Sequence, residues 1–426
     1  MRGIEVRRGV LRAGAVAILL VASAAVRPAR AQTVAVTNAR IHTVAGPVIE
    51  RGTIVFRDGR IIAVGADVQP PAGARIIDGT GRTVTPGLLD SSTTLGLVEI
   101  GADDGSNDAA STEIRNAAAL DVRDAINPLS TLIPVTRIEG ITRTVVQPQN
   151  GAALFAGRGV LIDLGGERVE AMVQRDPTAM YALLGQGGAA LVGGSRAAAL
   201  LRLREALQDA RRFAAARAAG GDPDEDFSLH RLDLEALGPV VGGTLPLAVT
   251  VHRASDILAV LRLARDFDLR VILMGATEGW RVAADIAAAG IPVVINPMQN
   301  IPGLENPGIT LENAARLAAA GVTVAFASFD AHNARNLKQI AGNAVAYGMP
   351  WDAALAAVTA VPASIWGIGD RFGTLEAGKD ADLVIWTGDP FELSTRAEHV
   401  FIEGQEVEMD SRQVELFRKY RRLNGR

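Results

Sequence analysis

Hydrophobic and polar positions are spaced differently at the two ends of the chain and in its middle. Near the start, short β-branched runs alternate with turn residues, at 33–41, 53–56, 60–64 and 74–77. Asp58-Gly59 between two of these runs is typical of a tight hairpin turn. The same spacing returns at 383–386 and 399–402, followed by a turn at Glu403-Gly404. Both ends of the chain are therefore predicted to be β-rich.

The middle of the chain, residues 85–365, alternates short apolar runs with helical patterns. The predicted strands are 141–146, 245–251, 270–274, 292–295 and 322–327. The predicted helices are 196–219, 255–266, 278–289, 311–320, 334–347 and 351–359. Gly290, Gly321 and Gly348 stand where helix C-caps are expected. Buried runs separated by helices predict a parallel sheet, open or closed.

These patterns divide the chain into four parts. Residues 1–31 form a leader, the β-rich parts at 32–84 and 366–410 flank a barrel-like middle at 85–365, and 411–426 form a basic amphipathic helix. We expect this last helix to pack on the body or on a partner subunit. One barrel and one small β domain account for the 426 residues.

The leader has the features of a signal peptide. Four arginines (Arg2, Arg7, Arg8 and Arg12) precede an apolar stretch at 13–26, and Ala29-Arg30-Ala31 supplies a cleavage site. The apolar stretch is shorter than the ~20 residues that a membrane span needs. We therefore predict a periplasmic or secreted protein with no membrane attachment after cleavage. An uncleaved anchor is the alternative, and Arg7-Arg8 leaves both Sec and twin-arginine export open.

Composition narrows the range of functions. The chain has no cysteine, which excludes disulfides, thiolate metal sites and cysteine nucleophiles. Residues 1–31 hold six arginines and one glutamate, so the remainder has 37 basic and 46 acidic residues, a net charge of −9. An acidic chain of this kind argues against nucleic-acid binding. We expect a small-molecule substrate and leave a homo-oligomer open.

Three segments resemble the amidohydrolase superfamily, in particular its imidazolonepropionase-like branch. They are Val84-Thr85-Pro86-Gly87-Leu88-Leu89-Asp90, the stretch from Gly373 to Val384, and residues 325–330 with the helices that follow. The resemblance implies a (β/α)8 TIM barrel with a small composite β-sandwich formed by the two terminal segments. It also implies hydrolysis of C–N bonds in a small molecule.

The metal-binding residues depart from the family pattern. Ser92 and Thr94 stand where the family has a His-x-His pair, and hydroxyls are poor ligands for zinc-type ions. No lysine precedes Lys338, so the carboxylated lysine of the family is excluded. Met274-Gly275 stands where a second histidine is usual. We predict at most one divalent, zinc-like ion rather than the usual binuclear centre, and leave its ligands unknown.

The candidate catalytic residues follow predicted barrel strands, where active sites of such barrels lie. His252 and Asp330 match family positions, and His332 is close to Asp330 in sequence. His252 could orient or activate water, and Asp330 could move protons. Asp330 also has a structural interpretation as the cap of the following helix. Among the other histidines, His42 and His399 belong to the predicted sandwich, and His230 is not assigned to any element.

The candidate substrate-binding residues are polar side chains near the same strand ends. Asn296 and Gln299 could line the pocket with neutral hydrogen-bonding groups. Glu278 could contact substrate, or it could be a first-turn glutamate favoured by the helix dipole. The acidic loop from Glu99 to Asp108 is interpreted as a mobile loop at the barrel mouth, with a hard-cation site as the alternative.

Two functional hypotheses follow from these residues. The first is an exported amidohydrolase-like hydrolase acting on non-peptide or cyclic-amide C–N bonds of a small molecule. The second is a catalytically inactive protein of the same fold that acts as a periplasmic binding or assembly factor. Both predict the same fold and the same pocket, so the sequence does not separate them.

Overall fold

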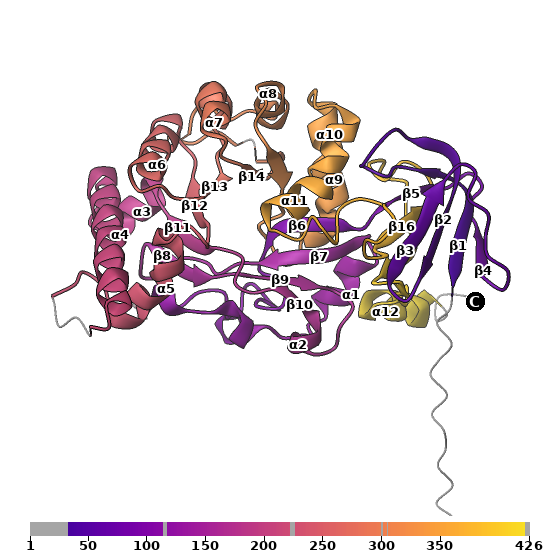
Figure 1. Ribbon diagram of the computed structural model, residues 1–426, viewed down its shortest axis with the longest axis horizontal. Helices are drawn as coiled ribbons and strands as arrows, with labels where there is room; N and C mark the ends of the chain where they lie inside the picture. Colours follow the sequence, from indigo (N-terminus) through magenta and orange to yellow (C-terminus); the bar gives the residue numbers. More distant parts are fainter. Residues whose placement is uncertain (1–32, 114–116, 222–225, 300, 305, 422–426) are drawn as a thin grey trace, which may run out of the picture.

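The computed structural model describes residues 33–113, 117–221, 226–299, 301–304 and 306–421. Figure 1 shows a barrel-like body of strands and helices with a separate β-sheet domain at one end. The leader at 1–31 and the acidic residues 222–225 lie outside the described residues. Among the helices that are described, none has the length and apolar character needed to cross a membrane.

The separate β domain is built from both ends of the chain. Its strands pair in the order β18-β17-β16-β5-β1-β2-β3, and β4 also pairs with β1. The early strands are β1 (Val34–Ile41), β2 (Ile49–Arg57), β3 (Arg60–Gly65), β4 (Arg75–Asp78) and β5 (Thr83–Pro86). The late strands are β16 (Leu383–Trp386), β17 (Ala397–Ile402) and β18 (Gln405–Glu406). The antiparallel pairing of β5 with β16 joins the two sets.

This sheet folds over so that strands distant in its order pack face to face. The first half of β1 pairs with β4 and its last two residues pair with β5, so the sheet branches at β1. Phe56 on β2 and Phe401 on β17 then meet across the interior with ring centroids 4.9 Å apart. Asp58 and Gly59, which turn the chain between β2 and β3, both have positive φ, at 52° and 76°. The Asp-Gly hairpin is confirmed, because a tight hairpin turn of this kind needs left-handed backbone.

The barrel has one antiparallel segment among otherwise parallel strands. The parallel strands are β6 (Leu88–Thr93), β7 (Ile141–Val146), β11 (Met180–Leu183), β12 (Leu247–Val251), β13 (Val271–Gly275), β14 (Val293–Ile295) and β15 (Val324–Phe326). Between β7 and β11 lie β8 (Phe155–Arg158) and β9 (Val160–Asp163), separated by Gly159 alone. β9 pairs antiparallel with β7, and β8 with β11. A short extra strand, β10 (Val173–Arg175), pairs with β9.

Helices follow most of the barrel strands and cover the outside. They are α1 (Leu132–Arg137), α2 (Val169–Met172), α3 (Gly185–Leu191), α4 (Arg196–Ala218), α5 (Arg231–Val241), α6 (Ala254–Asp266), α7 (Ala283–Ala289), α8 (Asn313–Ala319), α9 (Leu337–Ala346), α10 (Trp351–Ala356) and α11 (Ala360–Ile365). Two predicted helices begin as 3-10 turns, at η4 (Gly279–Val282) and η5 (Ala334–Asn336). The other 3-10 turns are η1 (Asp104–Ser106), η2 (Ala117–Ala119) and η3 (Val122–Ala125). Helix α12 (Arg412–Arg421) ends the described chain, and none of its described residues is buried.

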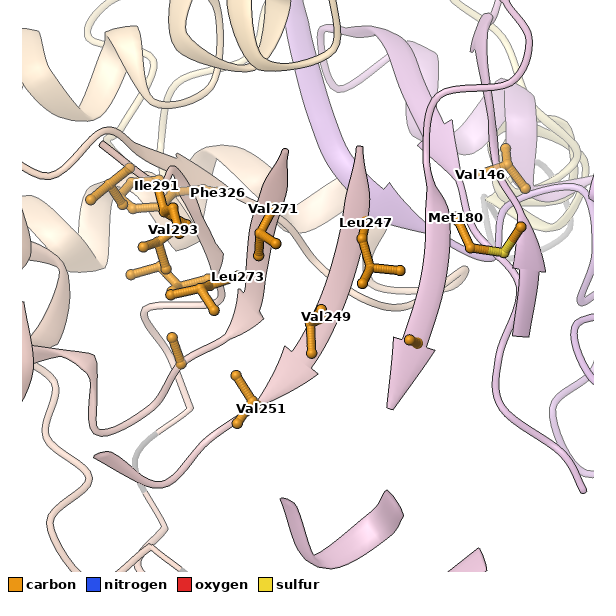
Figure 2. Packing of buried hydrophobic residues seen from close by; sticks show 14 of the residues in the cluster. Val146, Met180, Leu247, Val249, Val251, Val271, Leu273, Ile291, Val293 and Phe326 are labelled. Atoms are coloured by element: carbon orange, nitrogen blue, oxygen red, sulfur yellow. The ribbon is translucent and has the colours of Figure 1, made fainter. Parts of the chain in front are cut away.

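Side chains alternate between the barrel interior and the helix layer along each strand. On β12, Leu247, Val249 and Val251 belong to the large cluster that packs under the helices, as Figure 2 shows. Ala248 on β12 and Ile272 on β13 point the other way and belong to the interior cluster. Both faces of the strands are thus apolar, which explains why the sequence shows continuous apolar runs there.

The barrel closes at a seam between β6 and β15. At one end of the seam, the backbone amides of Leu89 and Phe326 donate to the carbonyls of Val358 and Ala357, so the segment after α10 fills the gap. At the other end, the backbone amide of Ser328 donates to a carboxylate oxygen of Asp90 over 3.1 Å. The seam is therefore closed partly by a side chain rather than by a continuous strand ladder.

A buried arginine joins the barrel to the composite β domain. Arg143 on β7 is 1% exposed and contacts Asp382 at 2.8 Å and Asp380 at 3.1 Å. Its guanidinium also lies 4.8 Å from the ring centre of Phe372. Burial alone would lower the pKa of Arg143, but the two carboxylates hold that pKa above its usual value. Arg143 therefore stays positively charged at all ordinary pH values.

Candidate functional site

His252 lies at the mouth of the barrel, directly after β12, where its ring packs over the neighbouring strand. Gly275 ends β13 and pairs with Val251 in the sheet. A Cβ atom at Gly275 would lie only 2.5 Å from Cε1 of His252. Gly275 also has a φ of +84°, a conformation that disfavours other residues. The glycine therefore makes the space that the imidazole occupies.

A chain of polar contacts runs from His252 to the loop after β14. Nδ1 of His252 lies 3.4 Å from the hydroxyl of Thr277, and the side-chain amide of Asn306 donates to the same hydroxyl over 3.0 Å. Thr277 is buried, whereas His252 is half-buried. Thr277 and Asn306 were not among the residues proposed from sequence. A polar residue two positions after β13 was the available signal for Thr277.

These residues form part of a cleft of about 400 Å³. Gln299 lines the cleft together with His252, as the sequence suggested. Apolar side chains form the rest of its wall, and two of them are strongly exposed, with Met298 at 46% and Ile301 at 84%. The described lining residues are His252, Thr277, Met298, Gln299, Ile301, Asn306 and Ile309. The cleft thus combines an imidazole and amide groups with an apolar wall, as small-molecule sites do.

Glu278 is buried beside the cleft and ties two loops together. One carboxylate oxygen accepts from the backbone amide of Gly308 over 2.8 Å, and the other from that of Ala254 over 3.1 Å. Ala254 is the first residue of α6, so the carboxylate also caps that helix. Glu278 therefore positions the loop that carries Asn306, and it is not among the described residues that line the cleft.

Asp330 follows β15 and holds the turn that comes after it. One carboxylate oxygen accepts from the backbone amides of His332 at 2.6 Å and Asn333 at 2.9 Å. The other accepts from the side chain of Asn333 at 3.1 Å. The carboxylate therefore holds the turn before η5 and does not cap this helix as the alternative expected, because Asn333 is the N-cap residue and no side chain caps the turn. His332 points elsewhere, with Nε2 lying 3.1 Å from the backbone oxygen of Glu99.

Asn296 belongs to the same side of the mouth as Asp330. Its side-chain amide donates to the backbone oxygen of Ser328 over 3.3 Å. Ser328 in turn donates its backbone amide to the buried carboxylate of Asp90. Burial raises the pKa of Asp90 to about 7, and the nearby charge of Asp330 adds to that rise. Asp90 is thus a carboxyl group that can change its charge near neutral pH, although in the sequence it stands out only as the last residue of the Val84–Asp90 motif.

The acidic loop after β6 is ordered by its own carboxylates. Glu99 accepts from the hydroxyl of Ser130 at 2.6 Å and from the backbone amide of Thr131 at 3.0 Å, at the start of α1. Burial opposes ionisation of Glu99, but these hydrogen bonds hold its pKa below the usual value. Asp103 caps the 3-10 turn η1 by accepting from Gly105. Both carboxylates therefore have structural partners.

The residues at the mouth do not fit a binuclear metal centre. Ser92 and Thr94 are buried hydroxyl residues at the two positions of the missing His-x-His pair, and Gly275, next to Met274 where a second histidine is usual, has no side chain to bind a metal. Within the described ranges, no three His, Asp or Glu side chains converge as metal ligands would. The three candidates His252, Asp330 and His332 therefore do not form such a group. The side chains present at the two family positions are hydroxyls rather than imidazoles, and hydroxyls are poor ligands for zinc-type ions, so their chemistry also argues against a binuclear centre.

The other histidines serve structural roles in the described part of the chain. His42 stacks on Trp351 with ring centroids 4.5 Å apart, and burial lowers its pKa. Nδ1 of His399 lies 2.6 Å from Glu406 in the composite domain. His230, which sequence analysis did not assign to an element, caps α5 by accepting from the backbone amide of Leu232.

Comparison with known proteins identifies the class to which this barrel belongs. A model of the amidohydrolase family matches residues 283–407. An imidazolonepropionase from Mesorhizobium japonicum is 28% identical over 424 residues, covering 84% of this chain and 93% of that protein. The amidohydrolase tasK of Hapsidospora irregularis is 26% identical over 391 residues, and the match spans only 39% of that longer protein.

A solved structure agrees over most of the chain. The amidohydrolase from Thermotoga maritima MSB8 superposes with a TM-score of 0.80 at 26% identity, covering 88% of this chain and 99% of that one. The fold is therefore a TIM-type barrel with a sheet domain formed by the two ends of the chain. The chain belongs to the amidohydrolase superfamily.

Proposed function

We propose that this protein is an exported hydrolase that cleaves a C–N bond in a small cyclic amide or peptide-like molecule. The observation that carries the proposal is His252, whose ring is fixed over Gly275 at the floor of the 400 Å³ cleft. An imidazole at the end of a barrel strand is positioned for proton transfer. Export rests on the sequence of residues 1–31 alone.

In this reaction a water oxygen adds to the carbonyl carbon, the C–N bond breaks, and the leaving nitrogen gains a proton. His252 takes the proton from water as the general base. Gln299 and Asn306 hold the amide of the substrate by hydrogen bonds, and Met298 and Ile301 contact its apolar part. Because the residues do not fit a binuclear metal centre, no step is assigned to one.

Asp330 and His332 have a secondary role in the proposal. Asp330 would move a proton at the β15 side of the mouth, where the backbone amides of His332 and Asn333 already orient its carboxylate. Three accepted hydrogen bonds hold its carboxylate in one orientation. Asn296 stabilises the β15 side of the barrel mouth by donating a hydrogen bond to the backbone oxygen of Ser328. Glu278 acts by positioning the cleft.

The test is turnover by the purified protein on hydantoins, lactams, imidazolones and short peptide amides, followed by mass spectrometry. We expect hydrolysis of at least one class, and a loss of about 10²–10⁴-fold in kcat/KM in His252→Ala. His399→Ala, which removes a histidine of the composite domain, is the matched control and should keep activity. Absence of turnover, with and without added Zn²⁺ or Mn²⁺, would exclude the hydrolase.

The second candidate is a catalytically inactive periplasmic binding or assembly factor. Ser92 and Thr94 in place of imidazoles, and a cleft with one imidazole, favour it specifically. In this case, ligands of the same classes would raise the melting temperature without being converted. Their binding would depend on Gln299 and Ile301 and would survive Asp330→Asn. Turnover that is lost in both His252→Ala and Asp330→Asn would exclude this candidate.

A further inference from the structure

The cleft beside His252 changes in character from its floor to its rim. At the floor, the side chain of Thr277 is buried and that of His252 is half-buried. At the rim, Met298 is 46% exposed and Ile301 is 84% exposed, and the neutral amide of Gln299 is exposed beside Met298 in the chain. A ligand whose polar part lies at the floor therefore has its outer part against apolar side chains.

The exposure of Met298 and Ile301 is itself informative. Single exposed apolar side chains are common on protein surfaces and need no explanation. These two, however, line the same cleft, three residues apart in one loop. An apolar group bound along them would remove both side chains from water, which is favourable.

The polar groups of the cleft are neutral. Among the described residues that line it, none carries a carboxylate, an ammonium or a guanidinium group. The polar lining consists of the hydroxyl of Thr277, the amides of Gln299 and Asn306, and the imidazole of His252. In the proposed function His252 is the general base and is therefore neutral when substrate binds. A charged ligand group would lose hydration there without gaining an opposite charge, which is unfavourable.

Two charged side chains near the cleft are held by other partners. The carboxylate of Glu278 accepts from the backbone amides of Gly308 and Ala254. Nε of Arg281 lies 3.9 Å from this carboxylate, and its guanidinium lies 4.8 Å from the ring centre of Trp280. The guanidinium also packs on Gly308, where an added Cβ atom would overlap it. Both charges therefore stabilise the loop, and neither has been left for a ligand.

We propose that the cleft selects an uncharged cyclic amide that carries an apolar substituent, with Ile301 as a specificity-determining residue. The inference rests on the proposed function, which places the amide of the substrate beside His252. The ring amide lies at the floor, and the substituent lies along Met298 and Ile301. Substituents of similar length that end in a carboxylate or an ammonium group are disfavoured.

The test compares three hydantoins that differ in one side chain on the ring carbon: isobutyl, carboxyethyl and aminopropyl. Dissociation constants are measured at pH 7 by isothermal titration calorimetry on His252→Ala, which lacks the proposed base. Values of kcat/KM are measured separately on the wild type. We expect isobutylhydantoin to bind roughly tenfold or more tightly than either charged compound, and to have the highest kcat/KM.

A charge placed on the rim should reverse this preference. Ile301→Lys adds an ammonium group at a side chain that is 84% exposed, so the fold should tolerate it. It should bind carboxyethylhydantoin roughly tenfold more tightly than the wild type does, and isobutylhydantoin more weakly. Leu393→Lys makes the same change at an 81% exposed leucine between β16 and β17, and should alter neither constant. Circular dichroism reports whether each variant is folded.

The outcomes separate this inference from the proposed function. Preferred binding of isobutylhydantoin without any turnover would support the inference and count against the hydrolase. Turnover that favours a charged hydantoin would support the hydrolase and overturn the inference. A preference for the anion that is lost in Arg253→Ala would also overturn it, and would assign anion recognition to the exposed arginine that follows His252. Absence of binding by all three compounds would overturn it as well.

Discussion

The carboxylate of Asp90 accepts the backbone amide of Ser328 over 3.1 Å and so links the first and last strands of the barrel. A second bond, from the backbone amide of Ser92, holds the same oxygen at 3.1 Å. Asp90 is completely buried, and burial raises its pKa to about 7. The closure of the barrel is therefore coupled to the protonation of one carboxyl group.

This coupling predicts a pH dependence of stability. The unfolded chain releases the Asp90 proton near pH 4 and the folded chain near pH 7, so the folded state binds more protons between these values. The contribution of Asp90 to stability is fully present below about pH 4 and falls as pH rises to about 7. Its slope is at most about 1.4 kcal/mol per pH unit.

Asp90→Asn removes the titrating group and keeps an oxygen acceptor for the Ser328 amide. We expect the free energy of unfolding of the wild type, measured relative to this variant by urea denaturation, to decrease from pH 5 to pH 8. Other buried carboxyl groups titrate equally in both proteins, so the difference isolates Asp90. Parallel stability curves for the two proteins would contradict the assigned pKa.

Gly275→Ala should destabilise the protein and displace His252. The new Cβ would meet Cε1 of the imidazole at 2.5 Å, in addition to the cost of a positive φ, roughly 1 kcal/mol. Gly193→Ala is the matched control, since Gly193 has a φ of +91° but no atom within 4 Å of an added Cβ. Thermal unfolding should show the larger loss for Gly275→Ala. Equal losses would mean that the ring does not pack on Gly275.

Arg143→Met should cost about 3–5 kcal/mol of unfolding free energy, because it leaves the carboxylates of Asp380 and Asp382 buried with less positive charge. Arg231→Met, which breaks an exposed pair with Glu235, should cost less than about 1 kcal/mol. Urea denaturation measures both changes. A loss below 1 kcal/mol for Arg143→Met would show that the joint between the barrel and the composite domain does not depend on this charge.

Thr277→Val should release the orientation of His252 while leaving the fold intact. The hydroxyl lies 3.4 Å from Nδ1 of His252 and accepts from Asn306, so valine removes both contacts at nearly constant volume. We expect the ring ¹⁵N resonances of His252, assigned with His252→Gln, to shift in Thr277→Val and to stay near the wild-type values in Thr277→Ser. Unchanged resonances in Thr277→Val would exclude Thr277 as the positioning residue.

The regular barrel strands could be predicted from sequence because their apolar runs are continuous. β7 was predicted with its observed bounds, and β12 to β15 were predicted within a few residues. The antiparallel pair β8 and β9 was missed. Gly157 and Gly159 interrupt that segment, and glycines weaken a strand pattern. Its reversed direction depends on pairing with β7 and β11, which the local sequence does not specify.

Site residues could be predicted from sequence only where they directly follow a strand. His252 follows a strand, and so its place at the barrel mouth could be inferred from the pattern alone. The contact between Asn306 and Thr277 could not be inferred in this way. It depends on the hydrogen bond by which Glu278 accepts from the backbone amide of Gly308 in a distant loop. The helix expected from residue 278 begins as the 3-10 turn η4, next to this contact.

The pairing of β5 with β16 sets an order on folding during synthesis. Thr85 and Trp386 are hydrogen-bonded although 301 residues separate them. While the ribosome is still translating the barrel, β16 has not yet been made, and the edge of β5 with which it pairs is therefore unpaired. This edge is exposed until nearly the whole chain has emerged, so a chaperone or an unfolded export route would have to protect it.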